Sequence, residues 1–260
     1  MKDTLLTALK ASGEILLGYF NKPMEIKHKE SQSSIVTEAD LASDSLIIKL
    51  ISEKFPGHNT LSEETGFINR NSEYTWIIDP LDGTSNFAAG IPWFGVLISL
   101  LRENTPVMGG ACLPTSDTLY FAEQGKGAFR NGKQFVMPVN RALKNSLVAF
   151  SLDYTDDEEF LNRGLEKFKY VVRNSRNVRS TNSLLDFLYV AEGKFGGCIN
   201  LYTKIWDIAG LSLLISEAGG RMTDLYGNDL HFLAGPEMLE KNFPVVAGPG
   251  EIVSSLKWPD

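Results

Sequence analysis

A short apolar segment that ends in a cluster of acidic and turn-forming residues constrains the fold of this chain most strongly. Residues 74–78 are aromatic or β-branched and predict a strand, which the following Asp79-Pro80 should end abruptly. The string Asp79–Phe87 reads Asp-Pro-Leu-Asp-Gly-Thr-Ser-Asn-Phe, in which proline stiffens the path between two carboxylates and glycine allows close backbone approach. Thr84 and Ser85 can begin a helix whose free N–H groups face an anion. Because Mg²⁺ prefers oxygen ligands and phosphate binds both cations and N–H donors, the string predicts a metal and phosphate site.

The pattern of apolar residues differs between the two halves of the chain. Before about residue 140, helical spacing in 1–20 and 39–55 is followed by alternating segments that predict an antiparallel meander, at 94–101, 107–113 and 117–123. After it, strand patterns at 146–151, 197–201 and 245–247 alternate with helical patterns at 156–170, 183–191 and 206–218. We therefore expect an α+β chain with two lobes. Residues 1–140 would form a mostly antiparallel N-terminal lobe that carries most metal ligands, and 141–260 an α/β C-terminal lobe.

Composition excludes several other classes of protein. A net charge of −7 makes nucleic acid and anionic membranes poor partners, although phosphate could still bind through a metal. The two cysteines, Cys112 and Cys198, form no CxxC pair, so a disulfide scaffold and a thiolate zinc site are not expected. This use of cysteine fits a reducing compartment, and we expect the protein in the cytoplasm. No apolar run reaches membrane-spanning length, and the amphipathic start of the chain predicts a helix and not a signal peptide.

Two further acidic motifs have ordinary structural explanations when each is taken alone. The pair Glu63-Glu64 could be a solvated turn, and Asp207, at the start of an apolar helix, could be its N-cap. Their combination with the Asp79–Phe87 string changes this interpretation. Together with Ser62-Glu63-Glu64 and Trp206-Asp207-Ile208-Ala209-Gly210, the string resembles the motifs of the inositol monophosphatase family, and the resemblance extends through nearly the whole chain.

The resemblance implies a layered αβαβα sugar-phosphatase fold, a phosphomonoesterase activity that depends on two to three Mg²⁺ ions, inhibition by lithium, and a homodimer. It implies that Glu63, Asp79 and the Leu81 carbonyl hold one Mg²⁺, while Asp79, Asp82 and Asp207 hold a second. Glu63 and Glu64 would help to hold a looser third ion through waters. Asp40 matches the aspartate that pairs with the motif threonine, here Thr84, and Lys29 matches a lysine on a mobile active-site loop.

In the mechanism that the resemblance implies, Thr84 receives a proton from the attacking water and Asp40 orients Thr84 as the base. The resemblance also places Glu63, a metal ligand, among the catalytic residues. Backbone donors at Gly83, Thr84 and Ser85 would neutralise the phosphoryl oxygens. The substrate-facing residues are expected on the second lobe, beside Asp207. Asn182, Ser183 and Leu184 stand where relatives usually carry Gly-Ser/Thr-Ala, and Asn200 stands where inositol-specific relatives often carry a glutamate that meets ring hydroxyls.

The sequence leaves the substrate and one other class of function open. A phosphatase with this fold could act on inositol monophosphate or a related sugar or polyol phosphate. The alternative substrates are histidinol phosphate, fructose bisphosphate and 3′-phosphoadenosine 5′-phosphate. The Ser85-Asn86-Phe87 sequence is similar to the inositol phosphatases, whereas nucleotide-specific members often have a charged pair there. A non-catalytic interaction protein that retains the fold is the other class. Loss of a catalytic carboxylate would favour it, and every carboxylate of the motifs is present.

Overall fold

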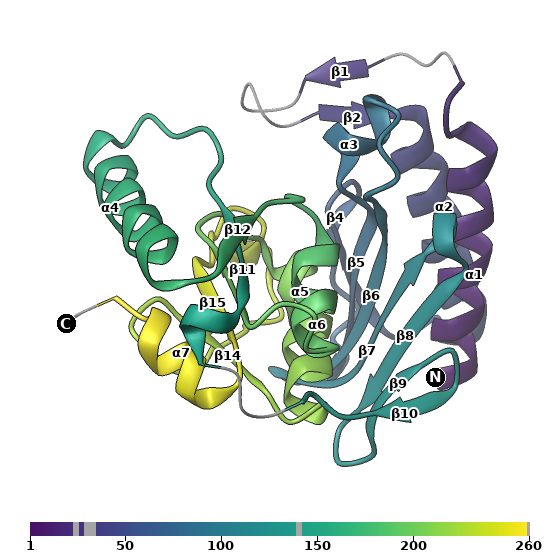
Figure 1. Ribbon diagram of the computed structural model, residues 1–260. Helices are drawn as coiled ribbons and strands as arrows, with labels where there is room; N and C mark the ends of the chain where they lie inside the picture. The colour runs from purple at the N-terminus through teal and green to yellow at the C-terminus, as the bar shows by residue number, and fades with distance from the viewer. Residues whose placement is uncertain (23–25, 29–34, 139–141, 259–260) are drawn as a thin grey trace.

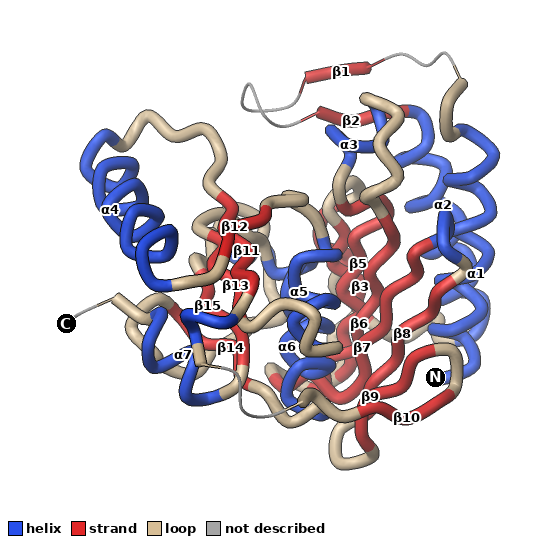
Figure 2. Tube along the Cα trace, viewed as in Figure 1, coloured by secondary structure: helices blue, strands red, loops and turns tan. Residues whose placement is uncertain are grey.

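Five alternating layers of helices and strands make up the computed structural model, which describes residues 1–22, 26–28, 35–138 and 142–258 (Figure 1). An outer pair of helices covers a large sheet, two central helices separate this sheet from a smaller one, and two further helices cover the smaller sheet (Figures 1 and 2). This is the layered αβαβα architecture that the motifs predicted.

The first layer consists of two helices joined by a short hairpin. Helix α1 (Lys2–Tyr19) buries Leu5, Leu9 and Leu16 against the large sheet, and α2 (Glu38–Lys54) lies beside it. Between these helices in the sequence, β1 (Ile26–His28) pairs antiparallel with β2 (Ile35–Thr37). Lys29, predicted to lie on an active-site loop, is outside the described residues.

The large sheet has eight strands and is antiparallel except where β3 runs parallel to β5. In spatial order its strands are β10 (Lys133–Phe135), β9 (Gly127–Arg130), β8 (Thr118–Glu123), β7 (Thr105–Leu113), β6 (Gly95–Arg102), β5 (Tyr74–Asp82), β3 (Asn59–Ser62) and β4 (Gly66–Ile68). The predicted end of a strand at Asp79 is wrong, because β5 continues to Asp82. Its pairing with β6 shifts register between Asp79 and Asp82, and this irregularity accommodates Pro80, which has no N–H to donate.

Two central helices lie between the sheets, α5 (Leu184–Ala191) and α6 (Ile205–Glu217). Helix α6 is apolar on nearly all sides because it packs against both sheets. Its Gly210 lies directly against Gly109 of β7, where a Cβ on Gly109 would come within 2.5 Å of the Gly210 carbonyl oxygen. These two glycines therefore set how closely α6 approaches the large sheet.

The second sheet is mixed, and two helices cover its outer face. Its strands in spatial order are β12 (Asn177–Arg179), β11 (Leu147–Ser151), β13 (Gly197–Asn200), β15 (Val245–Gly248) and β14 (Arg221–Asp224). The first three are parallel, and β15 runs antiparallel to both of its neighbours. The covering helices are α4 (Glu158–Asn174) and α7 (Gly250–Leu256), and the remaining helices are short: α3 (Thr84–Ala88), η1 (Pro114–Ser116), η2 (Leu143–Asn145) and η3 (Pro236–Met238).

The buried core bears on the predicted division into lobes. One apolar cluster joins residues of the large sheet, the central helices and the second sheet, so the two halves of the chain share a core. A boundary near residue 140 stays a prediction. Within the described part of the chain, no helix combines the length and apolar character needed to cross a membrane.

Candidate active site

A polar pocket of about 620 Å³ opens where the end of β5 meets the start of α6. Most residues predicted for the site line it: Glu63, Glu64, Asp79, Leu81, Asp82, Gly83, Thr84, Ser85, Asn182, Ser183, Asn200 and Asp207. These residues come from segments that are far apart in the sequence, and the fold brings them to one place.

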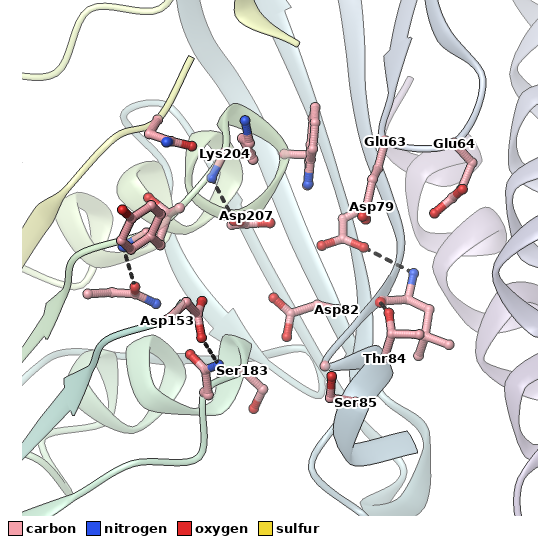
Figure 3. A pocket seen from close by; sticks show the side chains of 18 of the residues that line it. Glu63, Glu64, Asp79, Asp82, Thr84, Ser85, Asp153, Ser183, Lys204 and Asp207 are labelled. Carbon is pink, nitrogen blue, oxygen red and sulfur yellow. Dashed lines mark hydrogen bonds between the residues drawn. The ribbon is translucent and has the colours of Figure 1, made fainter. Parts of the chain in front are cut away.

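Three carboxylates form the centre of this pocket. Asp79 and Asp82 come from β5 and Asp207 from the first turn of α6, and each offers an oxygen within 4.8 Å of the others. Figure 3 shows the three side chains turned toward one shared space. The central packing of α6 against the large sheet is what places Asp207 beside two residues more than a hundred positions earlier.

Each of these carboxylates is oriented by a backbone N–H group. The N–H of Leu81 donates to Asp79 Oδ1 at 3.0 Å, and the N–H of Leu184, in the first turn of α5, donates to Asp82 Oδ1 at 2.6 Å. The N–H of Lys204 donates to Asp207 Oδ2 at 2.7 Å. Asp207 is thus not the N-cap residue of α6 but lies three residues after it, where its carboxylate still satisfies a free donor of the helix terminus.

The three carboxylates are poorly suited to be ionised without a cation. Burial is the largest effect and raises the pKa of Asp207 to about 7; it raises the pKa values of Asp79 and Asp82 as well, and the charges of neighbouring carboxylates add to the shift. Closely spaced ligands that offer only oxygen atoms suit a hard divalent cation such as Mg²⁺. The donor set of this pocket therefore fits the metal that the sequence resemblance implies.

The two glutamates lie in the turn between β3 and β4, on the same side of the pocket as Thr84 (Figure 3). The charge of Glu63 raises the pKa of Asp79, and that of Glu64 raises the pKa of Asp40, so both lie close enough to add to the negative field. Asp44 of α2, which sequence reasoning missed, is buried and accepts hydrogen bonds from the hydroxyls of Ser62 and Thr65. It thereby holds both ends of the turn that carries the glutamates.

Asp40 and Thr84 are in contact as predicted. The Thr84 hydroxyl lies 3.1 Å from Asp40 Oδ1 and 2.9 Å from the Leu81 carbonyl oxygen, and it donates its proton to one of these acceptors. Asp40 Oδ2 accepts from both the N–H and the hydroxyl of Thr37, at 2.8 and 2.6 Å. Burial raises the pKa of Asp40 to about 6, with these hydrogen bonds acting in the opposite direction. Asp40 does not line the pocket, so it reaches the pocket only through Thr84.

The backbone between Asp82 and Thr84 requires glycine. Gly83 has a φ of 82°, and a Cβ there would lie 2.6 Å from the Trp93 carbonyl oxygen. This conformation turns the chain from β5 into α3, so that Thr84 and Ser85 follow the carboxylates directly along the pocket wall.

The wall across from the glutamates is formed by the second sheet and the turn before α5. Asn182 has a φ of 49° and donates from Nδ2 to Asp153 Oδ1 at 2.7 Å, and Asn200 Oδ1 accepts from the N–H of Tyr202 at 3.0 Å. The prediction that the Leu184 side chain faces the substrate is wrong, because that side chain is fully buried in the central core and does not line the pocket. Only its N–H group, bonded to Asp82, contributes to the site.

Comparisons with known proteins agree with the geometry. A model of the inositol monophosphatase family matches residues 1–254. The chain is similar to a fructose-1,6-bisphosphatase/inositol-1-monophosphatase of Aquifex aeolicus, with 35% identity over 220 residues that cover 83% of this chain and 82% of that protein. It is similar to the Nus factor SuhB of Pseudomonas aeruginosa, with 30% identity over 262 residues that cover 98% and 94%.

Among solved structures, the chain resembles the crystal structure of the extragenic suppressor protein suhB from Bartonella henselae. The TM-score is 0.88 at 28% sequence identity, with 98% of this chain and 96% of that chain covered. The layered fold predicted from the sequence motifs is confirmed by this similarity.

Proposed function

This chain belongs to the inositol monophosphatase family, and on that premise we propose that it is a Mg²⁺-dependent phosphomonoesterase that hydrolyses a small phosphorylated sugar or polyol. One observation carries the proposal: three carboxylates from β5 and α6, with Asp79 buried and Asp82 and Asp207 half-buried, meet within 4.8 Å in a pocket that is also lined by Thr84. A pocket with so much negative charge cannot attract a phosphate ester by itself, whereas the same carboxylates with divalent cations can.

The residues proposed to hold the ions are Glu63, Asp79, Asp82 and Asp207, together with the Leu81 carbonyl oxygen and, through waters, Glu64. When bound, the ions would supply the positive charge that phosphoryl oxygens require and make a water in the site a stronger acid. The N–H groups of Leu81, Leu184 and Lys204 keep three of the carboxylates oriented, so little rearrangement is needed for binding.

Thr84 and Asp40 are proposed to move the proton of the attacking water. Because the Thr84 hydroxyl donates to Asp40 or to Leu81, a lone pair on Oγ1 is available to accept the proton of a water in the pocket. The proton of Thr84 then passes to Asp40 Oδ1, whose raised pKa makes it a better acceptor than an exposed aspartate. The N–H groups of Gly83, Thr84 and Ser85 are proposed to face the phosphoryl oxygens.

The alternative functions differ in what they require of the site. Inositol monophosphate, fructose bisphosphate, histidinol phosphate and 3′-phosphoadenosine 5′-phosphate would all use the same carboxylates and differ only at the opposite wall. A non-catalytic binding role, which the name of the Pseudomonas aeruginosa relative makes relevant, would not require Mg²⁺ turnover. Lithium inhibition, a homodimer and a cytoplasmic location are proposals that rest on the family resemblance alone.

Phosphate release from a panel of monoesters, measured against Mg²⁺ concentration, tests the proposal. Asp82→Asn retains an oxygen for the Leu184 N–H but loses its charge, so turnover should fall by at least ~100-fold while the melting temperature stays close to that of the wild type. Asp117→Asn is the matched control, because Asp117 is exposed and has a left-handed backbone that asparagine also adopts. No Mg²⁺-dependent release by the wild type on any ester, or full turnover by Asp82→Asn, would refute the proposal.

A further inference from the structure

Asp153 is a carboxylate of the pocket that the proposed chemistry does not use. Of the described residues lining the pocket, seven are Asp or Glu and one, Lys204, is basic. Five of the seven are assigned to the ions, which leaves Asp153 and Glu240. Asp153 is half-buried and faces the pocket from the wall across from Glu64 and Thr84 (Figure 3).

The topology of the second sheet explains why Asp153 lies there. Strand β11 is the middle one of three parallel strands, between β12 and β13, so the carboxyl ends of the three meet at one edge of the sheet. In α/β sheets, ligands bind beyond the carboxyl ends of the strands. Ser151 of β11 pairs with Asn200 of β13, and Asp153 follows Ser151 by two residues, so it extends the strand beside Asn200 into the pocket.

Neighbouring side chains fix one oxygen of Asp153 and orient the carboxylate. Asn182 donates to Oδ1 at 2.7 Å, and the turn that carries Asn182 is itself held by Asp186, whose Oδ2 accepts from the N–H groups of Thr181 and Asn182 at 3.1 and 3.2 Å. The hydrogen bonds among the described residues use only Oδ1 of Asp153. Its second oxygen is therefore available to a ligand, and the carboxylate is held in place before the ligand arrives.

The charge of this wall selects the kind of group that can bind. A carboxylate repels a phosphate or another carboxylate, but it accepts hydrogen bonds from hydroxyl groups, and such charge-assisted bonds are stronger than neutral ones. The side-chain oxygen of Asn200, by contrast, already accepts from the Tyr202 N–H. At the carboxyl end of these strands, Asp153 is thus better placed than Asn200 to supply a charged acceptor.

We propose that Asp153 determines substrate specificity by accepting hydrogen bonds from hydroxyl groups on the alcohol portion of the substrate, so that polyhydroxylated phosphate monoesters are preferred over apolar ones. This inference rests on the proposed function. It assigns to the segment that directly follows β11 the hydroxyl-recognising carboxylate that the residue at position 200, an asparagine, does not supply.

Two esters of equal ring size test the inference, myo-inositol 1-phosphate with hydroxyls and cyclohexyl phosphate without them. Asp153→Asn keeps an oxygen for Asn182 and removes the charge, so kcat/KM for the inositol ester should fall roughly ten- to a hundredfold, the range expected for one hydrogen bond to a charged group. For cyclohexyl phosphate, kcat/KM should change less than about twofold. Glu159→Gln in the exposed first turn of α4 is the control, with the same change of charge close by in the sequence, and should alter neither value.

Binding measured without turnover separates this inference from the proposed function. Calorimetry with Ca²⁺ in place of Mg²⁺ gives the Kd of each ester, and the Asp153→Asn substitution should weaken only the inositol ester, by the same factor. If wild-type protein binds but hydrolyses neither ester, the proposed function fails while selective weakening still supports the role of Asp153. Equal losses for both esters, no loss for either, or the same selective loss in Glu159→Gln would overturn it.

Discussion

The contact between Gly109 and Gly210 should control metal affinity at a distance from the ligands. Gly109 lies on β7 and Gly210 on α6, three residues after Asp207. In Gly109→Ala the new Cβ would lie 2.5, 2.7 and 2.9 Å from the oxygen, Cα and carbonyl carbon of Gly210, which are all backbone atoms that no rotamer change can move aside. Helix α6 must therefore shift away from the large sheet.

The size of the shift follows from the contact distances. Ordinary contacts of a Cβ begin at 3.4 Å, so the closest approach must lengthen from 2.5 Å by about 0.9 Å. Mg²⁺ requires near-ideal octahedral ligands at about 2.0–2.1 Å, and a displacement of this size moves Asp207 out of range of an ion held by Asp79 and Asp82. Overpacking of a core typically costs about 1–3 kcal/mol, which corresponds to a fall in melting temperature of roughly 2–12 °C for a chain of this size.

Calorimetric Mg²⁺ binding and thermal unfolding of the metal-free protein, measured on the same samples, test this reasoning. Gly109→Ala should raise the Kd for Mg²⁺ by about tenfold or more, since ~1.4 kcal/mol of lost binding free energy is one factor of ten. Gly57→Ala is the control, because Gly57 has no atom within 4 Å of the added Cβ and should change neither quantity. A Gly109→Ala protein that loses stability but binds Mg²⁺ with unchanged affinity would refute the link between helix position and the site.

Three further predictions concern groups around the carboxylates. Asp44→Asn replaces the buried carboxylate that accepts hydrogen bonds from Ser62 and Thr65. It should weaken Mg²⁺ binding up to about tenfold in calorimetry and lower the free energy of unfolding by about 1–3 kcal/mol. Unchanged Mg²⁺ affinity would show that the Glu63–Glu64 turn needs no support from Asp44. Thr84→Ala and Asp40→Asn should each reduce kcat by ~10²–10⁴-fold with little effect on KM, and the double variant should lose little more, whereas additive losses would argue against a shared proton path. Because burial raises the pKa of Asp207 from 3.8 to about 7, the folded metal-free protein holds this proton more tightly than the unfolded chain. The resulting stability is present below about pH 4 and lost as the pH rises through about 7, so the melting temperature of the wild type should fall over this range. The fall should be smaller in Asp207→Asn and smaller in the presence of Mg²⁺. Identical pH profiles for the wild type and Asp207→Asn would contradict this prediction.

The order of the elements could be predicted from the sequence because most of them have strong local patterns. The meander of β6, β7 and β8 and the helices α1, α2 and α6 follow the apolar periodicity of their segments. Asn131-Gly132, a dipeptide typical of hairpin turns, joins β9 to β10. The end of β5 could not be predicted in this way. Asp-Pro is typical of a turn, and only the pairing of Asp82 with Gly95 of β6 across an irregularity keeps this segment in the sheet.

The role of Asp207 illustrates a different limit. The residues next to it in the sequence explain an aspartate at the start of an apolar helix fully as a cap, and in the structure the Asp207 carboxylate does accept from the Lys204 N–H at the helix terminus. The same carboxylate also lies beside Asp79 and Asp82. A capping role and a place in the metal site are therefore compatible. An aspartate that only caps a helix and one that also lies in a metal site differ in the distance between α6 and β5, which tertiary packing sets.

Asp153 and Asp44 were missed because neither belongs to a local pattern that points to function. Asp153 follows an ordinary strand, and its position in the pocket depends on the parallel pairing of β11 with β13, whose residues are about fifty positions apart in the sequence. Asp44 lies one turn after Asp40 on α2, and its partners are in the turn between β3 and β4. A motif can identify side chains that are close in sequence and act on one ion, whereas residues that position them or select the substrate are recognised by contacts between elements. If Asp153 recognises hydroxyls, relatives that share every metal-binding motif can still prefer different substrates, because the strand ends of the second sheet can change without altering the carboxylates of β5 and α6.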